Sequence, residues 1–370
     1  MTKKENPETD INEFNAHHIN RDIRILFICK KRNDSYGISF GLVNSCKFIS
    51  SALKKYGIHS EVIQVIDNNC IEREVVKYKP THVFIEALWV VPEKIYILVR
   101  KYSNIHWLVR LHSEIPFLAN EGIAFEWIKK YILIAEYNPN FKISSNSKRI
   151  KESFCDCFGI NVSYNPNIYF PEKYDSMRII HSIHDKVQKN NKFIDIGCFG
   201  AIRPMKNQVM QALAAISFGH KNNRTIRFHI NSSRVEQKGD CILKNIRNIF
   251  EDSKHQLVEW DWMSHEDFIA LVRCMDIGMQ VSMSESFNIV SADFVDNNIP
   301  VVGSPEISWL NFLFVADPTN MQQIASKLEM IALGKHIGMQ KLNKIKLNNY
   351  NEESTEEWLN FLHVNKRDKF

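Results

Sequence analysis

Two carboxylates eight positions apart lie in the stretch "QVSMSESFNIVSADFVDNNIPVVGSPE", residues 280–306. The apolar run before Glu285 predicts a strand that ends at Ser284, and a helix is expected to begin near Asn288. The first N–H groups of a helix have no acceptor inside it, and the positive end of the helix dipole favours an anion such as phosphate. We therefore expect a phosphate to bind the N–H groups of Ser286, Phe287, Asn288, Ile289 and Val290.

The two carboxylates indicate what kind of phosphate ligand fits. Bound phosphate repels a nearby carboxylate unless that carboxylate accepts hydrogen bonds from hydroxyl groups of the same ligand. Asp293 follows Glu285 by about two helical turns, which predicts that both lie on one face. A ligand with hydroxyl groups on both sides of a diphosphate is a nucleotide sugar. We assign Glu285 to the sugar, the helix amides to the diphosphate and Asp293 to the ribose.

The pattern around these residues alternates between strands and helices. In the first half, strands are predicted at 23–30, 60–66, 81–87 and 106–112 and up to Ser145 and Tyr164, with a helix that ends at Gly57 as its C-cap. In the second half the alternation of strands and helices begins again at residue 192, with strands at 225–232, 255–262, 277–283 and 299–305. Ser264 and Asp267 form a capping box for the helix between two of them. This alternation predicts an α/β protein with two doubly wound parallel sheets.

These elements predict the domain organisation. We expect the first domain to be on the acceptor side and the second to bind the donor, with a ligand cleft between the two domains at the carboxyl ends of their strands. The expected parts are a flexible leader (1–20), a first Rossmann-like domain (21–170), a linker (171–191), a second Rossmann-like domain (192–335) and C-terminal helices (336–370) that can cross back to the first domain.

Composition excludes other classes. The chain has 370 residues, of which 44% are hydrophobic and 24% charged, as in soluble proteins of two domains. Its polar start has no export signal and no apolar run spans a bilayer, so a cytoplasmic protein is expected. Eight scattered cysteines indicate reduced thiols, and "CDC" at 155–157 lacks a second pair at zinc-finger spacing.

The segment "ESFNIVSAD", residues 285–293, resembles the E-x7-E motif of retaining glycosyltransferases with the GT-B fold, the family called glycosyltransferase group 1 or family 4. Asp293 stands where the family has a second Glu. "NNIPVVGSPEI" resembles the strand after that motif, and the resemblance spans residues 23 to about 317. It implies the GT-B fold and a nucleotide-sugar donor, predominantly a UDP-sugar.

Other segments carry the same resemblance. "FGAIRPMKNQ", residues 199–208, resembles the phosphate loop of the family, with Arg203 and Lys206 as the candidates. Ala201 follows the glycine where the family usually has its arginine, so Lys206 is the stronger assignment. "LVRLHSE" places His112 where many members carry a histidine that faces the donor sugar. His112 could equally be a structural histidine. The loop 32–41 could cradle a ligand or be a plain turn, and His181 and His184 are expected in solvent.

The mechanism implied by the resemblance is transfer with retention. Double displacement would need a nucleophilic carboxylate under the anomeric carbon, and none in the first half is clearly placed for it. The family mechanism is attack from the face of the leaving diphosphate, with the charge stabilised by Lys, Arg and helix amides. No D-x-D pair lies near a strand end, so no metal and no resident cofactor are expected.

The acceptor is predicted from charge and from a further resemblance. Basic residues in the first half could form a basic face, although each one alone is more typical of an ordinary solvated surface: Arg100, Lys101, Arg110, Lys129, Lys130, Lys142, and the run Lys148, Arg149 and Lys151. "THVFIEALWVVPEKIYIL" and "WLVRLHSEIPFLANEGIAFEWI" look like segments of bacteriophage glycosyltransferases that modify hydroxymethylated bases in DNA. The acceptor that this implies is hydroxymethylcytosine in double-stranded phage DNA, reached by base extrusion.

Other functions stay open. The chain could glycosylate a saccharide or a lipid-linked acceptor in surface glycan synthesis, with "FEWIKKYILIAEY" as a basic amphipathic helix on a membrane. It could also be a non-catalytic GT-B scaffold, although Glu285, Lys206 and His112 argue against that. An epimerase would need further acid and base residues that the sequence does not offer.

Overall fold

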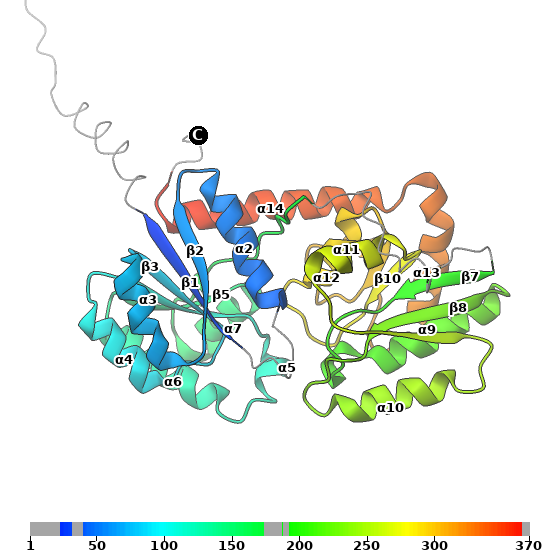
Figure 1. The fold of residues 1–370 in the computed structure, drawn as a ribbon, viewed down its shortest axis with the longest axis horizontal. Helices are drawn as coiled ribbons and strands as arrows, with labels where there is room; N and C mark the ends of the chain where they lie inside the picture. The colour runs from blue at the N-terminus through cyan, green and yellow to red at the C-terminus, as the bar shows by residue number, and fades with distance from the viewer. Residues whose placement is uncertain (1–22, 32–39, 174–186, 188–191, 365–370) are drawn as a thin grey trace, which may run out of the picture. The chain divides into compact units, whose positions relative to one another are not determined.

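The computed structural model describes residues 23–31, 40–173, 187 and 192–364, which divide into two compact units (Figure 1). Of the described residues, 23–31, 41–170 and 352–364 belong to unit 1, and 40, 171–173, 187 and 192–351 belong to unit 2. The leader 1–20, most of the linker 171–191, most of the loop 32–41, and His181 and His184 lie outside the described residues.

Unit 1 is built on a six-stranded parallel sheet with the strand order β2-β1-β3-β4-β5-β6. The five residues inside β1, Ile25–Cys29, are all buried, as expected for a parallel strand that is covered on both faces. The strands are β1 Arg24–Lys30, β2 His59–Val65, β3 His82–Glu86, β4 His106–Leu111, β5 Phe141–Ser145 and β6 Ser163–Tyr164.

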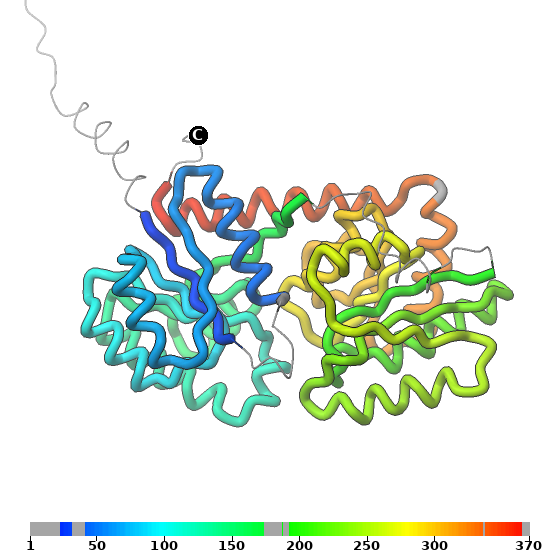
Figure 2. The backbone as a smooth tube through the Cα atoms, in the orientation of Figure 1, coloured from blue at the N-terminus to red at the C-terminus, as the bar shows by residue number. Residues whose placement is uncertain are grey.

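Helices cover both faces of this sheet. One core joins the sheet to η2 (Asn68–Cys70), α3 (Ile71–Tyr78), α4 (Pro92–Lys101), α5 (Ile115–Leu118), α6 (Ala124–Tyr137) and α7 (Lys148–Phe158). The opposite face packs against α2 (Phe40–Lys54) and the last turns of α14 (Lys341–Phe361). Figure 2 shows the end of α14, in red, beside the blue strands of unit 1, where Trp358 packs against both Phe27 and Phe84.

Unit 2 contains a five-stranded parallel sheet with the order β11-β10-β7-β8-β9. Its strands are β7 Phe193–Gly197, β8 Thr225–Asn231, β9 Gln256–Trp260, β10 Ile277–Gln280 and β11 Val301–Gly303. One face is covered by α9 (Gln208–Lys221), α10 (Gly239–Phe250) and α13 (Met321–Gly334), and α12 (Ile289–Asp296) packs on the other face beside α11 (His265–Arg273). Short 3-10 turns are η3 Pro204–Lys206, η4 Phe312–Phe314 and η5 Lys335–Ile337.

Two glycines let α12 approach the sheet closely. A Cβ atom on Gly278 would lie 2.6 Å from the ring of Phe294, and one on Gly197 would lie 2.9 Å from the same ring. Both distances are shorter than van der Waals contact, so a side chain at either position would push α12 away from β7 and β10. The position of this helix therefore depends on these glycines.

The predicted fold class, α/β with two parallel sheets, is confirmed. The N-cap of α11 is confirmed too, because Ser264 Oγ accepts a hydrogen bond from the Asp267 N–H at 3.1 Å. The strand expected to reach Ser284 ends at Gln280 instead, which lengthens the loop that carries Glu285. Among the described residues, no helix combines the length and the apolar character needed to cross a membrane.

Unit 1 contains a histidine whose titration should affect stability. The ring of His82 stacks on that of His106, with 4.9 Å between centroids. Burial, with the neighbouring His106 and His363, lowers the pKa of His82 to about 4. Unfolded histidine has a pKa near 6.5, so between pH 6.5 and pH 4 the unfolded chain binds more protons than the folded one. This difference makes the folded state less stable as the pH falls through that window.

We predict that between pH 7 and pH 4.5 the wild type loses about 2 kcal/mol more of its free energy of unfolding than His82→Gln does. Urea unfolding of both proteins at the two pH values measures this difference. The matched control is His59→Gln, at an exposed position of β2 in the same sheet. Equal pH dependence of the wild type and the His82 variant would show that His82 does not carry this effect.

Candidate functional site

Two loops of unit 2 are joined at the carboxyl ends of the neighbouring strands β7 and β10. The Asn207 side-chain amide donates to the Val281 carbonyl at 3.1 Å, and the Val281 N–H donates to Gln211 Oε1 at 2.9 Å. A backbone bond from the Met283 N–H to the Met205 carbonyl, 2.8 Å long, continues the connection. Because these bonds fix one loop against the other, side chains that come from distant parts of the sequence keep a constant separation.

Lys206 and Glu285 meet where these loops join. Lys206 Nζ donates to Glu285 Oε1, and their side chains are 13% and 10% exposed. Gly200 has φ +119°, a region that L side chains rarely adopt, and its N–H donates to Asn231 Oδ1 at 3.1 Å. A Cβ atom on Gly200 would lie 3.8 Å from Lys206 Cε, so the β7 loop passes directly beside the lysine side chain.

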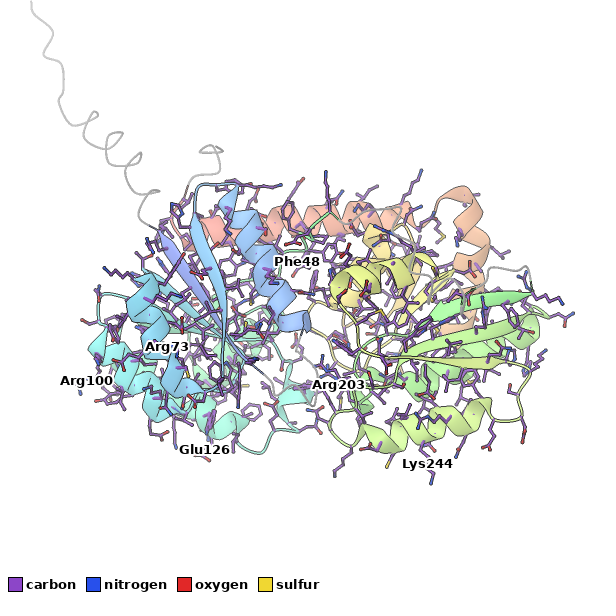
Figure 3. The ribbon with its side chains drawn as sticks, in the orientation of Figure 1. Phe48, Arg73, Arg100, Glu126, Arg203 and Lys244 are labelled. Carbon is purple, nitrogen blue, oxygen red and sulfur yellow. The ribbon has the colours of Figure 1, made fainter. Side chains whose placement is uncertain are left out.

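The charges at this point keep the carboxylate ionised. Burial by itself raises the pKa of Glu285, but the positive charges of Lys206 and Arg203 outweigh it and hold the pKa below its usual value. Arg203, which is labelled in Figure 3, comes from the same β7 loop, and its guanidinium lies 3.5 Å from Glu236 Oε2. Two cations, Lys206 and Arg203, therefore lie here together with the ionised Glu285 and a second carboxylate, Glu236.

The start of α12 supplies hydrogen-bond donors beside this ion pair. Asn288 has φ +61°, a conformation that asparagine tolerates better than most residues, and its Oδ1 accepts from the Ser291 N–H at 2.8 Å. Its Nδ2 donates to Gln280 Oε1 at 3.0 Å, which ties the cap to β10. Within the described part of the chain, the N–H groups of Ile289 and Val290 have no acceptor. Both groups can therefore donate a hydrogen bond, and their role with a phosphate stays a prediction.

The residues just before α12 are held by aromatic packing. The Phe287 carbonyl accepts from Trp309 Nε1 at 2.8 Å, and the Phe287 ring stacks on Tyr350 with centroids 5.3 Å apart. Phe287 is therefore buried, and among the predicted donor-binding residues Ser286 to Val290 its side chain serves to anchor the loop.

The expectation that Glu285 and Asp293 share one helical face is wrong. α12 begins at Ile289, and Asn288 in its left-handed conformation separates Glu285 from the helix. Asp293 is buried, and its Oδ1 lies 2.9 Å from Nε2 of His265, the first residue of α11. Burial lowers the pKa of His265, but the Asp293 carboxylate outweighs this effect and the net pKa is raised. Binding of a ribose by Asp293 stays a prediction, and His265 becomes a further candidate because it contacts this carboxylate.

In unit 1, His112 directly follows β4 and belongs to a buried cluster. Its Nε2 contacts Glu86 Oε2 at the end of β3, and Arg110 donates to the same Glu86 oxygen at 2.9 Å. The other ring nitrogen of His112, Nδ1, lies 3.4 Å from Asn146 Nδ2. Because Arg110 is fully buried, its assignment to a basic surface is wrong.

The predicted acceptor-binding residues lie on the first turn of α7. The side chains of Lys148, Arg149 and Lys151 are exposed, while Arg149 contacts Glu114 Oε1 at 3.1 Å. The ammonium group of Lys148 lies 5.4 Å from the centre of the Tyr164 ring. The structure thus brings the three residues onto one helix end, and their role with an acceptor stays a prediction.

Sequence reasoning missed Glu86 and His265 as members of these clusters. A signal existed for Glu86, because an acid that ends an apolar run at a strand terminus lies at the edge where ligands bind. His265 had a weaker signal, its position next to the cap Ser264. In the described part of the chain, no three His, Cys, Asp or Glu side chains come together as metal ligands, and metal independence stays a prediction.

Solved structures share the fold of this chain. Neither a protein-family model nor a curated protein sequence matches it. Sucrose-phosphate synthase from Thermosynechococcus elongatus superposes with a TM-score of 0.65 at 11% identity, over 92% of this chain and 98% of that one. A structure described as trehalose-6-phosphate from E. coli bound with UDP-2-fluoro glucose gives 0.64 at 12% identity, over 92% and 98%.

A third structure, a UDP-forming α,α-trehalose-phosphate synthase from Burkholderia xenovorans, gives a TM-score of 0.60 at 12% identity, over 92% of this chain and 99% of that one. At these identities the likeness concerns the fold. The expected GT-B fold class, with two parallel-sheet α/β domains, is confirmed.

Proposed function

We propose that a protein with this fold and this site is a glycosyltransferase that moves a sugar from a nucleotide sugar, a UDP-sugar, to a hydroxyl group. The observation that carries the proposal is the Lys206–Glu285 ion pair at the carboxyl ends of β7 and β10, close to the start of α12. Cations, a carboxylate and helix amides at one strand edge match a ligand with a diphosphate and hydroxyl groups. The solved structures support UDP as the nucleotide, since two are described as UDP-forming or bound with a UDP-sugar.

Each group has a role in this chemistry. Lys206, Arg203 and the N–H groups of Ile289 and Val290 bind the diphosphate and stabilise the charge that develops as it leaves. Such fixed donors act most strongly in the transition state, when the leaving group becomes more negative. Glu285 accepts hydrogen bonds from sugar hydroxyl groups. The acceptor hydroxyl attacks the anomeric carbon from the face of the leaving diphosphate, so that the new C–O bond forms as the bond to the diphosphate breaks. The hydroxyl proton passes to the leaving diphosphate oxygen, and the product keeps the anomeric configuration.

The ion pair determines how the two residues respond to substitution. Glu285 neutralises Lys206 when no ligand is bound, so a diphosphate competes with this carboxylate for the ammonium group. Removal of the carboxylate charge leaves Lys206 available to the diphosphate. Glu285 and Lys206 should therefore affect nucleotide binding in opposite directions.

We predict that Lys206→Ala weakens UDP binding by about 1.5–3 kcal/mol, because a charge-assisted hydrogen bond is lost. Glu285→Gln should keep or increase UDP affinity, yet lower sugar transfer about 100-fold.

Asp293→Ala should weaken UDP binding by about 1–3 kcal/mol if its carboxylate, with His265, holds the ribose. Calorimetry with UDP and the rate of UDP release from UDP-glucose measure these effects.

Lys221→Ala is the matched control for the lysine variant, because Lys221 is exposed at the end of α9 in the same unit. The assigned roles would be wrong if Glu285→Gln abolished UDP binding or if Lys206→Ala left both quantities unchanged. A wild-type protein that binds UDP-sugars but transfers none to any acceptor would be a binding scaffold. Interconversion of the sugar without transfer would indicate an epimerase.

For the acceptor we propose hydroxymethylcytosine in double-stranded DNA. The supporting observation is that α7 begins with three exposed cations and has no acid in its first turn. Cations at the positive end of a helix dipole are unfavourable, and the same helix end favours phosphate. The basic residues therefore stabilise a bound anion better than they stabilise the helix. Arg149 is the least available of the three, because it contacts the buried carboxylate of Glu114.

We predict that Lys148→Glu combined with Lys151→Glu weakens binding to duplex DNA, with an effect that does not depend on sequence. The slope of the logarithm of the binding constant against the logarithm of the salt concentration should become less negative by about 0.9 for each lost phosphate contact. The variant should stay folded, because acids suit the first turn of a helix. Fluorescence anisotropy at several salt concentrations measures the binding.

The control pairs Lys244→Glu with Lys221→Glu, which reverses two exposed charges in unit 2 (Lys244 is labelled in Figure 3). Transfer is tested with hydroxymethylcytosine DNA and a panel of nucleotide sugars, followed by digestion to nucleosides and a search for the mass gain of a sugar. No DNA binding at low salt, together with transfer to a saccharide or lipid-linked acceptor, would overturn the DNA proposal and support the alternative in surface glycan synthesis.

A further inference from the structure

The His265–Asp293 pair of unit 2 combines a buried carboxylate with a histidine that lies nearer the surface. Asp293 Oδ1 is 2.9 Å from His265 Nε2, and the side chain of Asp293 is 2% exposed while that of His265 is 11% exposed. A buried ionised carboxylate is tolerated only where a partner compensates its charge. Of the two groups, the imidazole is therefore the one that a ligand reaches more readily.

Helix geometry places this pair close to the start of α12. Asp293 follows Ile289, the first residue of α12, by four positions, so the two lie on one face, about 6 Å apart along the helix axis. Helical side chains tilt towards the N-terminus, which brings the Asp293 carboxylate closer to the first turn. His265 is the first residue of α11, which lies beside α12 (Figure 1). The imidazole therefore lies near the N–H groups of Ile289 and Val290.

The charges around His265 favour its protonated form. Burial lowers the pKa of this histidine, but three carboxylates outweigh burial and the net pKa is raised, with contributions from Asp293, Glu172 and Asp296. Asp296 also contacts the ammonium group of Lys344, which leaves Asp293 as the principal partner. The imidazole is thus protonated over a wider pH range than that of an ordinary histidine.

The position of His265 in α11 would by itself disfavour a positive charge. The N-terminus of a helix is the positive end of its dipole, where an acid is favourable and a cation is not. α11 has Glu266 and Asp267 in its first turn and Arg273 in its last turn, the distribution that suits the dipole. His265 departs from this distribution, and its protonation depends on the carboxylate of Asp293 in the neighbouring helix.

We propose that His265 is a proton-dependent cation of the nucleotide site, held beside the start of α12 by the buried carboxylate of Asp293, and that its protonated ring attracts the diphosphate of the bound nucleotide sugar. This inference rests on the proposed function, which supplies the ligand. The diphosphate in turn stabilises the imidazolium. Where His265 is neutral in the free protein, binding of the nucleotide sugar therefore takes up a proton from water.

The charge of His265 sets the direction of the pH dependence. Below the pKa of His265 the site carries the additional positive charge, and above it this charge is lost, so the affinity for a nucleotide sugar should fall as the pH rises. One partly screened charge near the diphosphate changes the affinity about three- to tenfold. UDP-glucose is a suitable probe, because its diphosphate is esterified at both ends, whereas a terminal phosphate titrates at about pH 6.

Calorimetry with UDP-glucose between pH 6 and pH 9 tests the proposal in the full-length protein. The wild-type dissociation constant should rise about three- to tenfold over this range, and buffers with different ionisation enthalpies should reveal proton uptake on binding. In His265→Asn, whose amide can still donate to Asp293, the pH dependence should disappear. The matched control is His220→Asn at an exposed position of α9 in the same unit, which should keep it.

A wild-type dissociation constant that does not change with pH, or equal pH dependence in His265→Asn, would overturn the proposal. The wild-type titration needs no variant, so it decides the question even if His265→Asn does not fold. Asp293→Asn removes the charge that favours the imidazolium. It should move the titration of His265 and the pH dependence of the affinity to lower pH together, and separate behaviour of the two would contradict the proposal.

The titration of His265, followed by NMR, separates this inference from the proposed function. The signal that is lost in His265→Asn identifies the residue, and saturating UDP-glucose should raise its pKa. UDP-glucose binding with an unchanged pKa of His265 would overturn the inference and leave the proposed function standing. No binding of UDP-glucose at any pH would overturn the proposed function, and this inference with it.

Discussion

The Lys206–Glu285 ion pair joins two parts of unit 2 that are almost eighty residues apart in the sequence. Neither residue could hold its position alone, since each lies in a loop after a short strand. The backbone and side-chain bonds between the β7 and β10 loops make the pair a fixed feature, and Gly197 and Gly278 let α12 approach closely enough for its first N–H groups to lie nearby. The site thus depends on close packing of backbone as much as on its charged groups.

Unit 1 uses buried charge in a different way. Glu86 and Arg110 have little access to water, so removal of either leaves the other as an uncompensated buried charge, which typically costs about 3–5 kcal/mol. A pair of packed apolar side chains in the same place would stabilise the fold to a similar extent. The Glu86–Arg110 pair lies beside His112, at the strand edge where α/β proteins bind ligands.

The fold could be predicted from the sequence because parallel strands are buried on both faces and therefore appear as continuous apolar runs such as Ile25–Cys29. The candidate residues Lys206, Glu285 and His112 could be placed after strands for the same reason, since all three follow such runs, and their roles stay predictions. The contacts among them could not be predicted. Glu285 and Asp293 have helical spacing, but α12 begins only at Ile289, after the left-handed Asn288, so Glu285 lies outside the helix and the spacing does not put the two on one face. The partners Glu86 and His265 come from other elements, and only the tertiary structure brings them to His112 and Asp293.

The central claim is that the loops after β7 and β10 together bind the diphosphate of a nucleotide sugar. Hydrogen–deuterium exchange with and without UDP-glucose tests it most directly, because backbone amides that donate to a ligand or lie beneath it exchange more slowly. The account predicts slower exchange in two peptides, one covering residues 198–207 and one covering residues 284–291, and no comparable change in α10. Binding of UDP-glucose with unchanged exchange in both peptides, or with protection confined to other elements, would contradict it.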